Sequence, residues 1–231
     1  MTFDVIIPAR DEASTVAEVV RAAGAAGNAG RVIVVDDGSR DGTADEARKA
    51  GAEVIASRGN GSKALALATG VAHSSADLLV FFDADILRAQ PRHFESLVAP
   101  VAGGAFAMCC GIIDYGPLRN PIFLRLPPIT GLRALRRTVF EAIPASKLNG
   151  FQIEIMINEV IARGGMPSAI RVLDGVGHRS KVEKLGRLPG TRAHLAMTAE
   201  LLHCLTFVPW WTYRSYLRNL TVLPPDMEPA P

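Results

Sequence analysis

The chain has 231 residues, of which 48% are hydrophobic and 21% are charged. This balance is typical of a globular protein with ample material for a core, and it excludes an intrinsically disordered chain. Because the net charge is only +2 and no block of Lys and Arg occurs, nucleic acid is excluded as the expected partner.

Strands and helices are expected to alternate through the first third of the chain. Ser14 is a plausible N-cap for the first helix, and Gly51 is a stop signal for the second. The strand–loop–helix repeat predicts an α/β fold with a doubly wound, mostly parallel sheet. The expected strands are 3–7, 31–35, 53–56 and 78–82, and the expected helices are 14–26, 41–49 and 64–72.

Polar side chains follow these strands at the points where they end. In open α/β sheets, ligands bind outside the carboxyl ends of the strands, so these side chains should converge on one site. They are Arg10 and Glu12, Asp36 and Asp37, Lys63, and Asp83 and Asp85.

Asp83-Ala84-Asp85 directly follows the apolar run LLVFF. Hard oxygen ligands of this kind are what Mg²⁺ or Mn²⁺ prefers beside a diphosphate. The alternative is a solvated turn with two ordinary aspartates, because strand-end Asp residues commonly form turns.

The segments IIPARDEAS, VVDDGSRDGT, GNGSKALALATG and FFDAD resemble, in this order, the nucleotide-sugar-binding half of GT-A fold glycosyltransferases. The pattern is similar to that of glycosyltransferase family 2 and the related glucosyl-3-phosphoglycerate and dolichol-phosphate-mannose synthases. The resemblance is dense over residues 3–86 and looser to about residue 185. It implies a GT-A domain over 1–195, with a nucleotide-sugar half (1–86) and an acceptor half (87–195).

The resemblance also implies roles for the residues of the first half. The loop with Pro8, Ala9, Arg10 and Glu12 would hold the nucleoside together with Asp36 and Asp37, since an ionised carboxylate only accepts hydrogen bonds. Lys63 would lie near the base or the phosphates, although the family more often has Gly-Lys-Gly where this chain has Asn60-Gly61-Ser62-Lys63. Asp83-Ala84-Asp85 matches the metal-binding DxD motif, with Asp85 as the expected direct ligand of Mg²⁺ or Mn²⁺ and Asp83 as its companion.

The acceptor half begins with an expected strand over 105–113. The apolar and arginine-bearing segment 117–128 is interpreted as a flap, an acceptor-side loop or a simple surface connection. Residues 130–137 resemble the acceptor loop of the family, and Arg133, with Arg136 and Arg137, would contact a phosphate or carboxylate of the acceptor. For Arg136 and Arg137 a solvated basic helix start is the alternative.

Glu154 begins an expected helix that extends to about Arg163. A carboxylate at a helix start is commonly there to compensate the helix dipole. The family resemblance instead places Glu154 beside the acceptor. Inverting members use a carboxylate there to deprotonate the acceptor hydroxyl, whereas in retaining members it is a contact residue with no agreed nucleophilic role. We favour Glu154 over Glu159 for this role.

Basic and imidazole groups follow an expected strand over 170–173. A lone His is usually structural, but the resemblance implies that His178 reaches the metal or the diphosphate, and neutral imidazole is an acceptable ligand. Arg179 and Lys181 would contact phosphates.

The C-terminal segment 196–223 is expected to be helical, followed by a disordered tail over 224–231. Its aromatic residues beside Arg214 and Arg218 would suit a membrane surface, a homodimer interface or packing onto the domain, and the last is the default. Adjacent Cys109 and Cys110 are expected to be buried thiols, which fits a cytoplasmic protein. No apolar stretch has the length of a membrane span, and the N-terminal residues lack the basic region of a signal peptide.

These patterns favour a metal-dependent glycosyltransferase that uses a nucleotide-sugar, most readily a UDP-sugar. The acceptor would be a small anionic molecule or a lipid phosphate. A receiver domain, a sugar-nucleotidyltransferase and a non-catalytic nucleotide-sugar-binding domain are the alternatives. The PARDE loop that precedes the acidic pair argues against the first two of these classes.

Overall fold

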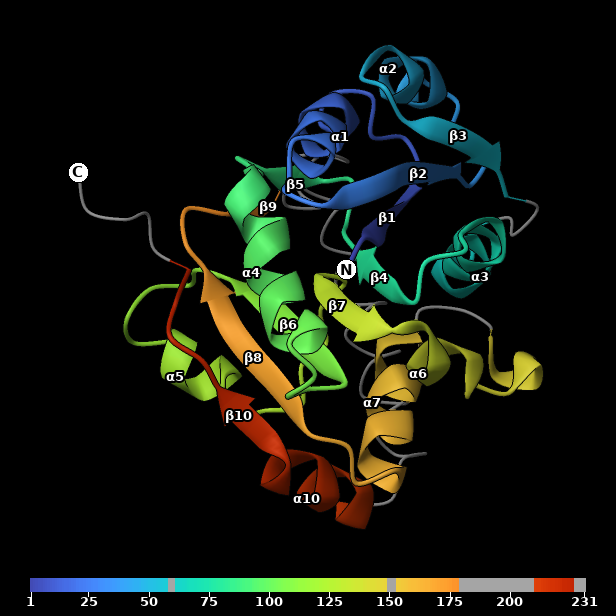
Figure 1. The fold of residues 1–231 in the computed structure, drawn as a ribbon. Helices are drawn as coiled ribbons and strands as arrows, with labels where there is room; N and C mark the ends of the chain where they lie inside the picture. Colours follow the sequence, from blue (N-terminus) through green and yellow to red (C-terminus); the bar gives the residue numbers. More distant parts are fainter. Residues whose placement is uncertain (58–60, 149–152, 179–209, 227–231) are drawn as a thin grey trace, which may run out of the picture.

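The computed structural model describes residues 1–57, 61–148, 153–178 and 210–226. Its main element is an eight-stranded sheet in the order β10-β8-β6-β7-β4-β1-β2-β3 (Figure 1). A second, two-stranded sheet pairs β5 with β9. The strands are β1 Phe3–Ala9, β2 Ala29–Asp36, β3 Glu53–Ala56, β4 Leu78–Phe81, β5 Ile86–Leu87, β6 Met108–Ile113, β7 Arg133–Arg136, β8 Ser168–Leu173, β9 Gly177–His178 and β10 Leu220–Val222.

Helices cover both faces of the large sheet (Figure 1). The apolar residues of β1 alternate between two cores, with Val5 and Ile7 in one and Ile6 in the other. The first core lies under α1 and α4, and the second lies under α3, α6 and α7, against which α10 packs. This burial on both faces explains why the strands read as continuous apolar runs. The helices are α1 Val16–Gly24, α2 Thr43–Lys49, α3 Lys63–His73, α4 Pro91–Ala102, α5 Asn120–Phe123, α6 Arg137–Glu141, α7 Ile153–Arg163 and α10 Trp210–Arg218, with a 3₁₀ turn at Ala145–Lys147.

The predicted α/β class and parallel pairing are confirmed for β1–β4, which match the expected strands closely. Strand β1 nevertheless continues through Pro8, which was expected to end it. Pro8 is opposite Val35 of β2, while the pairing of β1 with β4 stops at Ile6 and Phe81. The N–H that proline lacks would face the β4 side, where no ladder partner is needed.

The first helix begins later than expected. Val16 is its first residue and Thr15 its N-cap, so Ser14 is not the cap. The backbone N–H groups of Thr15 and Val16 both donate to the carbonyl of Glu12, which forms a tight turn ahead of the helix. The Thr15 hydroxyl donates to the same carbonyl at 3.3 Å.

The C-terminal part of the chain completes the edge of the sheet. Strand β10 runs parallel to β8, and Tyr216 of α10 is buried in the second core, so this residue packs onto the domain. Asp226 was expected to lie in a disordered tail, but it is buried against α4, where its carboxylate accepts hydrogen bonds from the N–H of Asp174 (2.6 Å) and the hydroxyl of Ser96 (3.2 Å). The predicted tail therefore begins no earlier than residue 227. Within the described ranges, none of the helices is both long and apolar enough to cross a membrane.

Candidate active site

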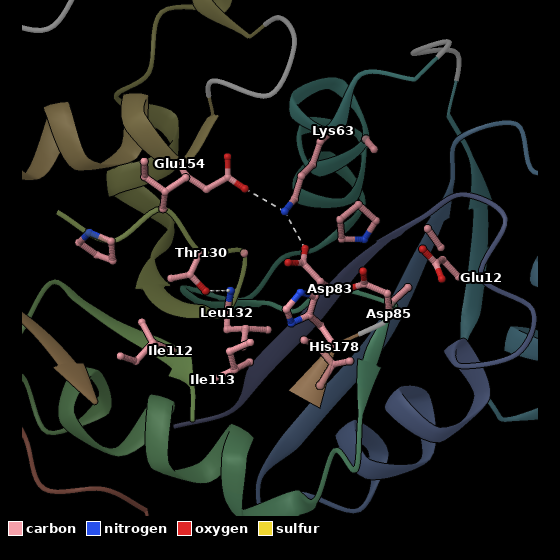
Figure 2. A pocket seen from close by; sticks show the side chains of 18 of the residues that line it. Glu12, Lys63, Asp83, Asp85, Ile112, Ile113, Thr130, Leu132, Glu154 and His178 are labelled. Carbon is pink, nitrogen blue, oxygen red and sulfur yellow. Dashed lines mark hydrogen bonds and ion pairs between the residues drawn. The ribbon is translucent and has the colours of Figure 1, made fainter. Parts of the chain in front are cut away.

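A cavity of about 820 Å³ opens at the carboxyl ends of β1, β2 and β4 (Figure 2). It lies at the carboxyl edge between β1 and β4, where the strand order of the sheet reverses, as expected for ligand sites in open α/β sheets. The cavity brings together most of the predicted site residues: Pro8, Ala9, Arg10, Glu12, Asp37, Lys63, Asp83, Ala84, Asp85, Glu154 and His178. Asp36 and Arg133 do not line it, and Arg179 and Lys181 lie outside the described residues.

Lys63 joins the two halves of the site. It is the first residue of α3, whose N-cap Ser62 accepts a hydrogen bond from the N–H of Leu65. The Nζ atom lies 2.6 Å from Oδ1 of Asp83 and 2.8 Å from Oε1 of Glu154 (Figure 2). Burial alone would lower the pKa of Lys63, but the attraction of the two carboxylates outweighs it and raises the pKa. Lys63 is therefore a permanent cation between two acidic side chains.

Asp83 follows β4 and is held from the opposite side by Gly131. A Cβ atom added to Gly131 would overlap the Asp83 carboxylate, so only glycine fits beside it at this spacing. The Thr130 hydroxyl, which accepts from the N–H of Leu132 at 3.1 Å and donates to the carbonyl of Gly111 at 2.9 Å, fixes the backbone around Gly131. The loop after β4 and the loop before β7 are thus fitted to each other at this carboxylate.

His178 lies on β9 of the small sheet, and Asp85 immediately precedes β5, the strand that pairs with β9. Ile86 of β5 is opposite His178 of β9, which places the imidazole next to the DxD segment, and both side chains line the cavity (Figure 2). This arrangement was not evident from the sequence, because a two-residue strand has no periodicity.

The residues of the cavity suit a divalent cation whose remaining ligands come from a bound diphosphate. Nowhere in the described part of the chain do three or more His, Cys, Asp or Glu side chains group closely enough to hold a metal alone. Asp83 is engaged by Lys63, and Asp85 and His178 line the cavity beside it with a carboxylate and an imidazole. Mg²⁺ is commonly bound by one or two carboxylates together with substrate phosphates, and Mn²⁺ accepts the same oxygen ligands, so the donor set fits a site completed by the ligand.

Asp36 and Asp37 have different environments. Asp36 caps a turn, since its Oδ1 accepts hydrogen bonds from the backbone N–H and the hydroxyl of Ser39. Asp37 is 7% exposed and lines the cavity, and its buried Oδ1 has no hydrogen-bond partner among the residues described here. An unsatisfied buried carboxylate oxygen costs free energy, so it points to a ligand that donates a hydrogen bond there. Of the pair, Asp37 lines the cavity and Asp36 does not, and a joint role in holding the nucleoside stays a prediction.

The loop after β1 is fixed by hydrogen bonds to the loop after β2. Its backbone N–H groups donate to side chains of the second loop: Asp11 to Ser39 (3.0 Å), Glu12 to Thr43 (2.8 Å) and Ala13 to Asp41 (3.1 Å). In return Asp11, which has a φ of 56°, accepts from the N–H of Arg40 at 2.7 Å. Asp11, Asp41 and Thr43 were not predicted to shape the site, and the Asx-type spacing of Asp41 and Thr43 was the available local signal.

Arg133 does not contact the cavity, contrary to the prediction. It lies at the start of β7, a central antiparallel strand between β4 and β6, and is 1% exposed. Its guanidinium donates to the carbonyl of Thr130 at 3.0 Å through Nε and to Oδ1 of Asn158 at 3.4 Å. Asn158 in turn donates to the carbonyl of Pro128 at 2.9 Å. Arg133 is therefore a positioning residue that ties the loop before β7 to α7, and α7 presents Glu154.

The other two arginines of this basic run also satisfy the backbone. Arg137 donates to the carbonyls of Ala76 (2.8 Å) and Val71 (3.1 Å), and Arg136 donates to the carbonyl of Val101 (3.4 Å). Of the predicted acceptor loop, residues 130–132 line the cavity, whereas residues 133–137 form β7 and the start of α6. Strand β7 is hard to recognise in the sequence, because its four residues are two arginines with only Ala134 and Leu135 between them.

The choice of Glu154 over Glu159 is consistent with their placement. Glu154 lies in the first turn of α7 and reaches the cavity, whereas Glu159 pairs with Arg163 at 2.7 Å and does not line it.

One wall of the cavity is apolar and includes part of segment 117–128, for which an acceptor-side loop was one of the expectations. It is formed by the end of β6 and by residues between β6 and β7, namely Ile112, Ile113, Tyr115, Phe123, Leu126, Pro127, Pro128 and Ile129. The carboxylates and Lys63 thus face a wall without charged groups.

The fold and the cavity define a GT-A-like α/β domain with an acidic ligand site at the carboxyl ends of its strands. Residues 4–152 match the family model "Glycosyl transferase family 2". The chain therefore belongs to glycosyltransferase family 2. This membership overturns the receiver-domain and nucleotidyltransferase alternatives.

Curated proteins and solved structures show the same similarity. Glucosyl-3-phosphoglycerate synthase of Mycolicibacterium paratuberculosis is 26% identical over 219 residues, covering 78% of this chain and 66% of that protein. Undecaprenyl-phosphate 4-deoxy-4-formamido-L-arabinose transferase of Salmonella paratyphi A is 33% identical over 111 residues, covering 43% of this chain and 33% of that protein. The match thus spans about two thirds of the first relative and one third of the second.

A crystal structure of glucosyl-3-phosphoglycerate synthase from Mycobacterium tuberculosis, in complex with Mn²⁺, UDP and glucosyl-3-phosphoglycerate, superimposes with a TM-score of 0.66 at 25% identity. The match covers 77% of this chain and 72% of that one.

Proposed function

We propose that this chain transfers a sugar from a UDP-sugar to an acceptor that bears an anionic group. The observation that carries the proposal is the buried, unsatisfied Oδ1 of Asp37 in a cavity that Asp85 and His178 also line. An ionised carboxylate can accept a hydrogen bond from the base or from a ribose hydroxyl. The similarity to a synthase crystallised with UDP and Mn²⁺ supports UDP as the nucleotide.

Asp85 and His178 would hold Mg²⁺ or Mn²⁺, with Asp83 beside them. The bound ion offsets the negative charge that develops on a departing diphosphate. Lys63 places a fixed positive charge next to Asp83 and fixes the carboxylate of Glu154 at 2.8 Å. In this proposal Glu154 accepts the proton of the attacking acceptor hydroxyl.

The names of the relatives support an anionic acceptor. One acts on phosphoglycerate and another on a lipid phosphate. The predicted arginine contacts do not support it, because Arg133, Arg136 and Arg137 bond to the protein's own carbonyls.

Calorimetric titration of UDP and GDP, with Mn²⁺ and again with EDTA, tests the proposal. We expect UDP to bind only with the metal, and Asp37→Asn to weaken UDP about tenfold or more, because a charged hydrogen bond is lost. Asp36→Asn is the matched control, since asparagine can still accept from Ser39 and Asp36 does not line the cavity. UDP binding that EDTA leaves unchanged, or equal affinities of both variants, would refute the assigned site.

Glu154→Gln should lower turnover about 10²- to 10⁴-fold while sparing UDP affinity, because it removes a general base but keeps the shape of the side chain. Release of UDP from UDP-glucose, with 3-phosphoglycerate or undecaprenyl phosphate as acceptor, is the assay. Glu159→Gln should retain activity, since Glu159 pairs with Arg163 away from the cavity. Full activity of Glu154→Gln would remove Glu154 from the mechanism.

A further inference from the structure

Residues 115–129 form an exposed apolar segment at the mouth of the cavity. Among the described residues, six large hydrophobic side chains with an exposure of 40% or more lie here, and Leu118 reaches 87%. They are Tyr115, Leu118, Ile122, Phe123, Leu126 and Ile129. Contiguous exposed apolar patches of this kind mark interaction surfaces in proteins.

The segment has a defined structure of its own. Asp114 accepts hydrogen bonds from the N–H of Gly116 (2.7 Å) and the amide of Asn120 (2.8 Å), and Asn120 accepts from the N–H of Tyr115 (2.9 Å). The rings of Tyr115 and Phe123 pack with centroids 4.6 Å apart. The apolar side chains are therefore presented by a built turn, followed by the short α5 helix.

The patch is continuous with the active site. Tyr115, Phe123, Leu126 and Ile129 line the cavity and are also exposed, whereas Leu118 and Ile122 are exposed beyond it. A molecule that covers the patch would thus extend from the outer surface to the wall opposite Asp83 and Glu154.

The charges on the patch are of one sign. Arg119 and Arg125 are its charged residues, both exposed, and no acidic residue occurs between Asp114 and Glu141. Apolar side chains interleaved with arginine match the chemistry of an amphiphile that has an apolar chain and an anionic head.

We propose that segment 115–129 is a lipid-docking surface and that the acceptor is an amphiphile with an apolar chain and a phosphate. The apolar chain packs on Leu118 and Ile122, and Arg119 and Arg125 contact anionic headgroups. This inference rests on the proposed function and narrows its acceptor class.

A second copy of the chain fits this surface less well. A symmetric dimer would bring the arginines of two identical patches together, and it would cover the mouth of the cavity through which an acceptor must enter.

Co-sedimentation of the 231-residue chain with vesicles tests the proposal, using phosphatidylcholine alone and phosphatidylcholine mixed with phosphatidylglycerol. We expect binding that is stronger on the anionic vesicles. The double variant Leu118→Ser/Ile122→Ser should weaken it about tenfold or more, because two exposed apolar groups no longer enter the lipid. Arg119→Gln and Arg125→Gln should each cost about fivefold on anionic vesicles only.

Leu217→Ser is the matched control, because Leu217 is 39% exposed on α10, away from the cavity. It should bind vesicles like the unmodified chain. Loss of vesicle binding in Leu217→Ser but not in Leu118→Ser/Ile122→Ser would move the lipid contact to the C-terminal segment and overturn the proposal.

UDP titration with Mn²⁺ on the same samples separates this inference from the proposed function. Normal UDP binding without any vesicle binding would overturn the proposal of a lipid-docking surface and leave the proposed function standing. A change from dimer to monomer in Leu118→Ser/Ile122→Ser by light scattering, with vesicle binding unchanged, would overturn it in favour of an interface between copies.

Discussion

Gly131 lies against the carboxylate of Asp83, and the contact leaves no room for a side chain. The same carboxylate bonds to Lys63, which also holds Glu154. Through these contacts, residues from four separate parts of the chain determine one another's positions. Adding a single methyl group at Gly131 should therefore shift the side chains of Asp83, Lys63 and Glu154 together.

Gly131→Ala should displace Asp83 from Lys63 and weaken metal-dependent UDP binding by about tenfold, with a loss of about 1–3 kcal/mol in the free energy of unfolding from overpacking. Calorimetry and urea unfolding measure the two effects. Gly24→Ala is the control, because a Cβ atom there meets nothing within 4 Å. The control should be neutral or more stable by up to about 1 kcal/mol. Unchanged UDP affinity in Gly131→Ala would show that Asp83 can move without consequence.

Helix α4 begins with a buried histidine. His93 accepts a hydrogen bond at Nδ1 from the N–H of Gln90 (2.9 Å), and its Nε2 lies 3.0 Å from the carbonyl of Asp174. A ring that accepts at one nitrogen and donates at the other is neutral. Burial lowers the pKa of His93, and the attraction of Asp226 offsets this only in part.

This lowered pKa makes stability depend on pH. As the pH falls below about 6.5, the unfolded chain takes up a proton on this histidine before the folded chain does. The free energy of unfolding should then decrease by up to about 1.4 kcal/mol per pH unit, until the pH reaches the lowered pKa of the folded state. Urea unfolding at pH 7.5 and 5.5 measures this decrease in the free energy of unfolding. His93→Asn should show a smaller decrease over this range, and an equal decrease would mean that other groups are responsible.

At the scale of the whole molecule, residues 220–226 are tied to the middle of the chain. Strand β10 extends the sheet beside β8, and Asp226 then reaches across to Ser96 of α4 and to the N–H of Asp174. Arg92 donates to the carbonyl of Asp226 at 2.8 Å. The residues after the last strand therefore hold α4 against the acceptor-side half of the sheet.

Asp226→Ala should lower the free energy of unfolding by about 1–3 kcal/mol, because two partly buried donors lose their acceptor. Chemical denaturation measures the change. Asp45→Ala should change stability by less than about 1 kcal/mol, since Asp45 is 75% exposed and its pair with Arg48 is solvated. Equal effects of both variants would contradict a structural role for the C-terminal contacts.

Much of the donor half of the site was predictable, because strand, turn and DxD motif are adjacent in the sequence. Local patterns set the four parallel strands, and the carboxyl ends of parallel strands meet at one edge by geometry. The placement of Asp37, Lys63 and Asp85 around one cavity follows that expectation. The roles of these residues in binding and catalysis remain predictions.

The acceptor half was less predictable because its side chains are used by long-range contacts. A basic run such as Arg133–Arg136 reads as a solvated or ligand-binding loop, yet the structure inserts it between β4 and β6, where each guanidinium bonds to backbone carbonyls. The sequence by itself determined the α/β class, the donor-side strands and the acidic motif, since these depend on periodicity and adjacency. Only the tertiary structure decided which aspartate is unsatisfied, which arginine is structural and which apolar residues remain exposed, because these depend on partners distant along the chain.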